Sequence, residues 1–124
     1  MSEKNSMKIF LVDDEEITNY INKEVIRIYD SSMETREFLK GQEALEILES
    51  DQPDYIFLDL MMPEMNGFQF LEELKNRNIN APVVVLSSST SPDDKERASN
   101  YKNVVTFFSK PLNAQYLKSL FAGA

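Results

Sequence analysis

Five short apolar runs alternate along the chain with segments whose apolar residues recur every three or four positions. The runs cover residues 7–12, 33–39, 54–60, 83–86 and 104–108. A nearly continuous apolar run predicts a strand covered on both faces, whereas loose alternation, as in residues 33–39, predicts an edge strand. The pattern therefore predicts five strands, with residues 54–60 as the central one.

The segments between these runs have the spacing of amphipathic helices. Helices are predicted at residues 15–29, 41–49, 67–76 and 112–121, and a further one after Ser91. Ser91 is expected to cap that helix, with Pro92 at its first position, although its apolar face is poor. In the first helix the spacing predicts one buried face, made of Ile17, Tyr20, Ile21, Val25 and Ile28.

Strict alternation of short apolar strands and helices favours right-handed crossover connections and a parallel sheet. We therefore predict an α/β fold, a doubly wound five-stranded parallel sheet with helices on both faces. One domain is expected over residues 7–121, preceded by a flexible N-terminal segment at 1–6. In such sheets, ligands bind outside the carboxyl ends of the strands.

Composition narrows the possible chemistry. The 124 residues suffice for one domain with a real core. The absence of cysteine and histidine excludes disulfides, thiol and imidazole catalysis and the usual zinc ligands. A formal charge of −8 argues against direct binding of nucleic acid. No membrane-spanning stretch or signal segment is apparent, which predicts a cytoplasmic protein without membrane partners.

Chemically active residues end four of the predicted strands. Asp13 and Asp14 follow the first run, Asp59 ends the third, Ser87 follows the fourth, and Lys110 comes just after the fifth. Three carboxylates brought together at one sheet edge repel one another unless a cation lies between them. Ligands that offer only oxygen select hard ions, so we expect Mg²⁺, with Mn²⁺ also compatible.

The same residues predict phosphoryl transfer to a carboxylate. Asp59 can attack phosphorus, Lys110 can stabilise the transferring group, and Ser87 can donate its hydroxyl to a phosphoryl oxygen. Taken singly, each feature has a commoner structural interpretation, such as a turn or helix cap for Asp13-Asp14. Their occurrence at successive strand ends makes the functional interpretation the stronger one.

With these residues in place, the chain from about residue 7 to 121 resembles a response-regulator receiver domain of two-component signalling, similar to the stand-alone chemotaxis regulators. The resemblance is carried by short motifs at the strand ends: residues 11–15, Asp59 with Met62-Pro63, Met65 and Gly67, Ser87-Ser88, and Phe107 with Lys110-Pro111. It implies the flavodoxin-like (βα)5 receiver fold.

The resemblance also implies roles for the site residues. Asp59 would accept a phosphoryl group from the phosphohistidine of a histidine kinase or histidine phosphotransfer protein. Asp13, Asp14 and Asp59, together with the backbone carbonyl of Met61, would hold Mg²⁺, and Lys110 would contact the phosphoryl group. The domain would thus catalyse its own Mg²⁺-dependent phosphorylation and a slow dephosphorylation.

A conformational switch is implied as well. The hydroxyl of Ser87 would move toward the phosphoryl group and the ring of Phe107 would rotate into the vacated space. The peptide bond between Lys110 and Pro111 is expected to be cis. The changed surface would be that of the fourth helix, fifth strand and fifth helix, about residues 92–121, which would meet a downstream protein target.

One position predicts the lifetime of the phosphoryl group. Met61 and Ser89 stand where side chains influence hydrolysis in this family, and a thioether cannot orient an attacking water. We therefore expect phosphoryl loss to take minutes or longer. The charged fourth helix, with Asp93, Lys95 and Arg97, is the expected site of partner contact.

Three other functions share part of this sequence pattern. A phosphate-independent interaction module with a receiver fold predicts a broken acceptor or metal site, whereas every residue named above is present. A flavin-binding domain needs a phosphate-binding loop after the first strand, where this chain has Asp13-Asp14-Glu15-Glu16. An aspartyl phosphatase would want a second acid just beyond Asp59, where Met61 stands.

Overall fold

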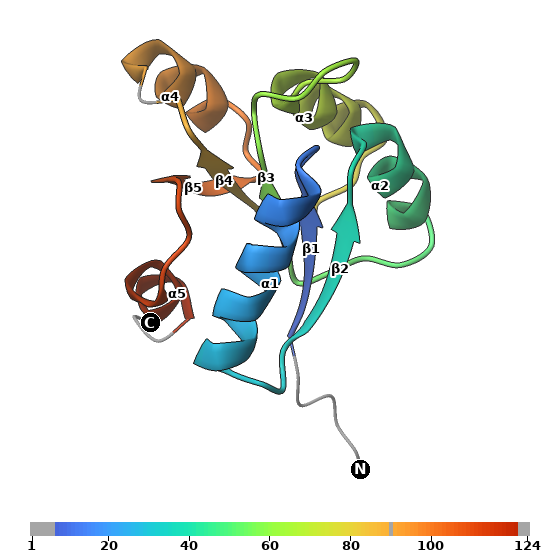
Figure 1. Ribbon diagram of the computed structural model, residues 1–124. Helices are drawn as coiled ribbons and strands as arrows, with labels where there is room; N and C mark the ends of the chain where they lie inside the picture. The colour runs from blue at the N-terminus through green and yellow to red at the C-terminus, as the bar shows by residue number, and fades with distance from the viewer. Residues whose placement is uncertain (1–6, 90, 122–124) are drawn as a thin grey trace.

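Five parallel strands form a single sheet in the order β2-β1-β3-β4-β5, with helices on both sides (Figure 1). The computed structural model describes residues 7–89 and 91–121. The strands are β1 (Lys8–Val12), β2 (Glu34–Phe38), β3 (Tyr55–Leu58), β4 (Val83–Ser87) and β5 (Val104–Ser109). The helices are α1 (Glu16–Tyr29), α2 (Gly41–Leu48), α3 (Gly67–Asn76), α4 (Pro92–Ser99) and α5 (Ala114–Phe121). The predicted doubly wound fold is confirmed, with β3 at the centre and β2 at an edge.

Side chains of successive strand residues point to opposite faces and build two cores. Phe10 and Val12 of β1 pack with α2, α3 and Ala98 of α4, whereas Ile9 and Leu11 pack with α1 and α5. Because both faces are covered, β1 is buried from its second residue onward. The helices thereby hold the carboxyl ends of β1, β3 and β4 in fixed positions.

The predicted buried face of α1 is wrong. Ile17 and Ile28 are 63% and 76% exposed, Tyr20 and Ile21 are also exposed, and Val25 is only partly covered. The residues buried by this helix are Asn19, Asn22 and Ile26.

Asn19 supplies the physical reason. Its Nδ2 atom donates to the backbone carbonyl oxygens of Asp13 at 3.0 Å and Phe38 at 3.3 Å. The carbonyl of Phe38 also accepts from the amide of Asp13 at 3.1 Å, whereas the carbonyl of Asp13 takes its donor from Asn19. This buried polar contact places Asn19 on the inner face of the helix, and the isoleucine stripe turns outward. The Oδ1 atom of Asn19 has no hydrogen-bond partner among the described residues.

Side-chain caps set three of the helix starts, and α3 begins with a capping box between Asn66 and Gln69. Ser91 accepts a hydrogen bond from the amide of Asp94 at 3.4 Å, with Pro92 at the first helical position, as predicted. The last helix begins at Ala114, two residues later than predicted, because the side chain of Asn113 accepts from the amide of Tyr116 at 2.9 Å. Leu112 is buried in the core ahead of the helix.

The segment 1–6, expected to be flexible, lies outside the described residues. Among the helices that the structure describes, none combines the length and the apolar character required to cross a bilayer.

Candidate functional site

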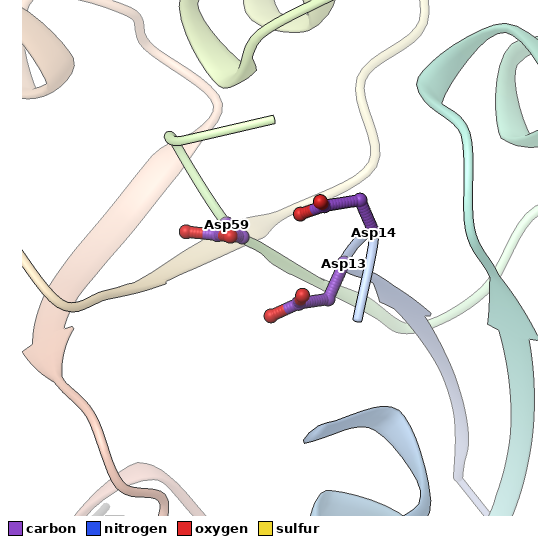
Figure 2. Close-up of side chains that lie close together, drawn as sticks. All are labelled: Asp13, Asp14 and Asp59. Carbon is purple, nitrogen blue, oxygen red and sulfur yellow. The ribbon is translucent and has the colours of Figure 1, made fainter. Parts of the chain in front are cut away.

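The fold brings the predicted site residues to one edge of the sheet. Asp13 and Asp14 follow β1, Asp59 follows the neighbouring β3, Ser87 ends β4, and Lys110 follows β5. Figure 2 shows the three aspartate side chains gathered where β1 and β3 end. One carboxylate oxygen from each of the three lies within 4.8 Å of the others.

Backbone amides hold one oxygen of each buried carboxylate. Asp13 and Asp59 are each 4% exposed. The amide of Glu15 donates to Oδ1 of Asp13 at 2.9 Å, and the amide of Met61 donates to Oδ1 of Asp59 at 3.2 Å. The Oδ2 atom of each carboxylate is directed toward Lys110, which follows the end of β5.

Lys110 offsets part of the charge of these two carboxylates. Its Nζ atom lies 2.8 Å from Oδ2 of Asp13 and 3.5 Å from Oδ2 of Asp59. Burial, and then the charge of Asp13, raise the pKa of Asp59, although the Met61 amide and Lys110 act in the opposite direction. Burial alone would lower the pKa of Lys110, but the hydrogen bond to Asp13 and the charges of both aspartates outweigh it and raise this pKa.

A tight turn fixes the chain after Asp59. The amide of Gly67 donates to the carbonyl of Leu60 at 3.0 Å. A Cβ atom on Gly67 would lie 2.6 Å from the Cα atom of Leu60 and 2.8 Å from the carbonyl oxygen of Asp59. Only glycine permits this approach, so Gly67 holds the start of α3 against the backbone of Asp59 itself.

Ser87 is fully buried beside the acidic cluster and is tied to the start of α4. Its Oγ atom accepts from the amide of Ser89 at 3.2 Å, and Oγ of Ser89 donates to Asp94 of α4 at 2.7 Å. The carbonyl of Ser87 accepts from the amide of Lys110 at 2.9 Å. One strand end thus touches both the charged site and α4.

The aromatic and the proline predicted at β5 lie close by in the fold. Phe107 is partly buried and packs against the core on the side of α2, α3 and α4. The peptide bond between Lys110 and Pro111 is cis. Phe107 pairs in register with Val85, two residues before Ser87 on β4.

Comparison with known protein families assigns the chain to one of them. The model of the response regulator receiver domain matches residues 9–122. The chain belongs to this family. A receiver domain is the phosphoacceptor part of a two-component response regulator, and such systems usually pair it with a histidine kinase.

Individual relatives agree with that assignment. Over 88 residues the chain is 46% identical to a protein-glutamate methylesterase/protein-glutamine glutaminase of Treponema denticola, covering 66% of this chain and 22% of that protein. A two-component response regulator from Cytophaga hutchinsonii has a TM-score of 0.85 at 28% identity, covering 96% of this chain and 97% of the other. The chain spans between 22% and 38% of the length of three curated relatives.

The receiver domain's acidic cluster fits a hard divalent cation. Its donors are all carboxylate oxygens, three of them lie close together, and two belong to buried residues. A single ammonium, that of Lys110, faces two buried carboxylates, so a further cation is favourable. Receiver domains bind Mg²⁺ or Mn²⁺ at such a cluster, and the Mn²⁺-bound response regulator Rcp1 resembles this chain with a TM-score of 0.78 at 26% identity, covering 93% of this chain and 94% of the other.

Sequence reasoning missed three supporting groups of the receiver site. They are the amide of Glu15 on Asp13, the carboxamide of Asn19 under the ends of β1 and β2, and Asp94 bound to Ser89. A hydrogen bond from a backbone amide cannot be predicted from residue type. The burial of Asn19 could have been predicted, because it falls at helical spacing with Asn22 and Ile26.

Proposed function

We propose that this receiver domain is a signalling switch in which Asp59 accepts a phosphoryl group from the phosphohistidine of a histidine kinase or histidine phosphotransfer protein. One observation carries the proposal. Asp59 is buried, one of its oxygens is held by the amide of Met61, and the other faces the ammonium of Lys110. A carboxylate so oriented presents a defined oxygen to an incoming phosphorus atom.

The transfer balances without any further reactant. An oxygen of Asp59 forms a bond to phosphorus, the phosphorus–nitrogen bond of the donor breaks, and its electron pair stays on the imidazole. Lys110 moves its charge from the two carboxylates to the phosphoryl oxygens. When Mg²⁺ is bound by Asp13, Asp14, Asp59 and the carbonyl of Met61, it offsets the negative charge of the phosphoryl group.

Ser87 couples this reaction to the surface. Its Oγ atom acts as an acceptor toward Ser89, which leaves the hydroxyl proton free for a phosphoryl oxygen. Movement of Ser87 toward that oxygen disturbs the contact from Ser89 to Asp94 at the start of α4. Phe107 then occupies the vacated space.

The response surface is that of α4, β5 and α5. Only Ala98 of α4 is buried, so few apolar contacts resist a displacement of this helix. Phosphorylation shifts the surface by as much as it favours one of the two arrangements, and a downstream protein reads the change. Asp93, Lys95 and Arg97 lie on this helix and are the proposed contacts.

The phosphodonor docks elsewhere, on the exposed apolar stripe of α1. Ile17 follows Asp14 by three residues and Ile21 lies one turn further on, so the stripe begins beside the acceptor site. Apolar residues left exposed in a row favour a protein contact. The Ile17→Gln/Ile21→Gln variant should react normally with acetyl phosphate, yet accept phosphate about tenfold more slowly from any kinase that phosphorylates the parent protein.

The decisive experiment is intact-mass analysis after incubation with Mg²⁺ and acetyl phosphate. A single phosphoryl adduct is expected, lost in Asp59→Asn and in a sample with EDTA, and kept in Asp93→Asn as the matched control. An adduct that survives Asp59→Asn would place the acceptor elsewhere. No adduct on a folded protein would favour the phosphate-independent interaction module.

A further inference from the structure

A groove opens between α3 and α4 at the edge of the sheet opposite to Asp59. It lies where α3 and α4 end, before the amino ends of β4 and β5, and has a volume of about 540 Å³. Small-molecule sites occupy roughly 300–1,000 Å³. The groove is therefore large enough for a ligand and separate from the acidic cluster.

Among the charged residues that line the groove, the basic ones outnumber the acidic. Lys75, Arg97 and Lys102 line it against a single acidic residue, Glu72. The chain as a whole has the opposite balance, with 21 acidic and 13 basic residues. The groove thus concentrates positive charge on an otherwise acidic protein.

The three basic side chains of the groove form no ion pair with a carboxylate of the described residues. Arg97 stacks over the ring of Phe68, its guanidinium carbon 4.0 Å from the ring centroid. Glu72 accepts a hydrogen bond from the hydroxyl of Tyr101 at 3.0 Å.

The walls of the groove are braced before any ligand arrives. The contact between Tyr101 and Glu72 joins α3 to the segment after α4. Nδ2 of Asn103 donates to the carbonyls of Ile79 at 2.8 Å and Ala81 at 3.0 Å, which fixes the entry to β5 against the entry to β4. A preformed site loses less entropy on binding.

We propose that this groove binds a phosphate-bearing small molecule, up to about the size of a mononucleotide. Lys75 and Lys102 provide compact point charges suited to phosphate oxygens. The carboxamides of Asn78, Asn80 and Asn100 line the same groove, make no hydrogen bond to other described residues, and supply donors and acceptors for the rest of the ligand. Such a ligand bridges α3 and α4.

The test is a titration of isotopically labelled protein with AMP, followed by amide chemical shifts, in EDTA so that no metal draws phosphate to the acidic cluster. We expect shifts at the amides of residues 78–80 and 100–103 with a Kd of about 1 mM or tighter, and binding of adenosine at least about tenfold weaker. Equal binding of adenosine would show that the phosphate plays no part. If neither AMP nor inorganic phosphate shifts these amides at ten times the expected Kd, the groove is not a phosphate site.

Two matched double variants distinguish specific binding of AMP in the groove from non-specific attraction of the anion to surface lysines. Lys75→Gln/Lys102→Gln should weaken AMP binding at least about tenfold, whereas Lys40→Gln/Lys118→Gln removes the same charge outside the groove and should leave it unchanged. All four lysines are exposed, so both variants should fold. Equal weakening in both, or none in the first, contradicts the proposal.

Discussion

The ammonium of Lys110 donates a hydrogen bond to Oδ2 of Asp13 at 2.8 Å, joining residues 97 positions apart in the sequence. Lys110 also lies 3.5 Å from Asp59, so one cation serves two carboxylates of which each is 4% exposed. Removing this cation would leave two buried carboxylates uncompensated, which costs more than the pair itself contributes. The functional site is therefore also an element of the protein's stability.

Lys110→Gln should destabilise the protein when no divalent ion is present. The two buried carboxylates would then face each other without a cation, at a cost of about 3 kcal/mol in the free energy of unfolding. Urea denaturation with and without Mg²⁺ measures this, and Mg²⁺ should recover a large part of the loss. Lys118→Gln, an exposed control, should change little, and an equal loss there would contradict the explanation.

Asp59→Asn should stabilise the metal-free protein at neutral pH, because it removes one of two buried carboxylates that repel each other while Lys110 stays paired with Asp13. Burial raises the pKa of Asp59, so between its unfolded and folded pKa values the native state binds more protons than the unfolded state. The stability of the parent protein therefore falls, relative to the variant, as the pH rises through this window.

Urea denaturation of both proteins across pH, in EDTA, measures that difference. The advantage of Asp59→Asn should be full at neutral pH and vanish once the pH falls below the ordinary range of an aspartate. A difference that stays constant with pH would mean that titration of Asp59 does not cause it.

Gly67→Ala should be far more harmful than Gly41→Ala. A methyl group on Gly67 would meet backbone atoms of Leu60 and Asp59 at 2.6 and 2.8 Å, which cannot yield without moving the acceptor. On Gly41 it would meet Sδ of Met65 at 3.0 Å, the far part of a flexible side chain, and Phe70 at 3.2 Å.

Stability and phosphorylation together distinguish these glycine variants. We expect Gly67→Ala to lose about 3 kcal/mol and most of its reaction with acetyl phosphate, and Gly41→Ala to lose about 1 kcal/mol or less and react normally. Thermal unfolding and intact mass provide the two readouts. Normal phosphorylation of Gly67→Ala would show that the turn tolerates displacement.

The parts of the fold that the sequence predicted well are those decided by apolar runs. β1 and β3 were found because a strand covered on both faces must be apolar throughout, and its end then marks where Asp13 or Asp59 emerges. Because the strands are parallel, their carboxyl ends must meet at one edge of the sheet. The site residues could thus be grouped from the sequence alone.

What periodicity failed to predict lies on α1. Its spacing is equally regular on the isoleucine side and on the side of Asn19, Asn22 and Ile26, so the hydrophobic rule chose the wrong face. The buried face is set by the hydrogen bonds of Asn19 to the strand-end carbonyls of Asp13 and Phe38, of which that of Asp13 depends on Asn19 for its donor. Such a requirement belongs to the tertiary structure and is not visible in a single helix.

The corrected face of α1 predicts a sharp contrast between two isoleucines. Ile26 is fully buried, so Ile26→Ala should cost about 2–4 kcal/mol in the free energy of unfolding. Ile28 is 76% exposed, and Ile28→Ala should change the free energy by about 0.5 kcal/mol or less. Urea denaturation of the two variants checks this, and a larger loss at Ile28 would restore the face predicted from periodicity.

The lifetime of the phosphoryl group should depend on Met61. Its side chain is 60% exposed directly beyond Asp59, and a thioether neither donates a hydrogen bond nor orients a water for attack on phosphorus. We expect a half-life of minutes or longer for the adduct in Mg²⁺. Met61→Asn, which introduces a carboxamide at the same place, should shorten it severalfold, whereas Met61→Leu should leave it unchanged.

Decay of the phosphoryl adduct, followed by intact mass after removal of acetyl phosphate, measures the lifetime in all three proteins. Decay of the parent within seconds would show that a water is positioned by other groups, and Met61 would then have no part in setting the lifetime.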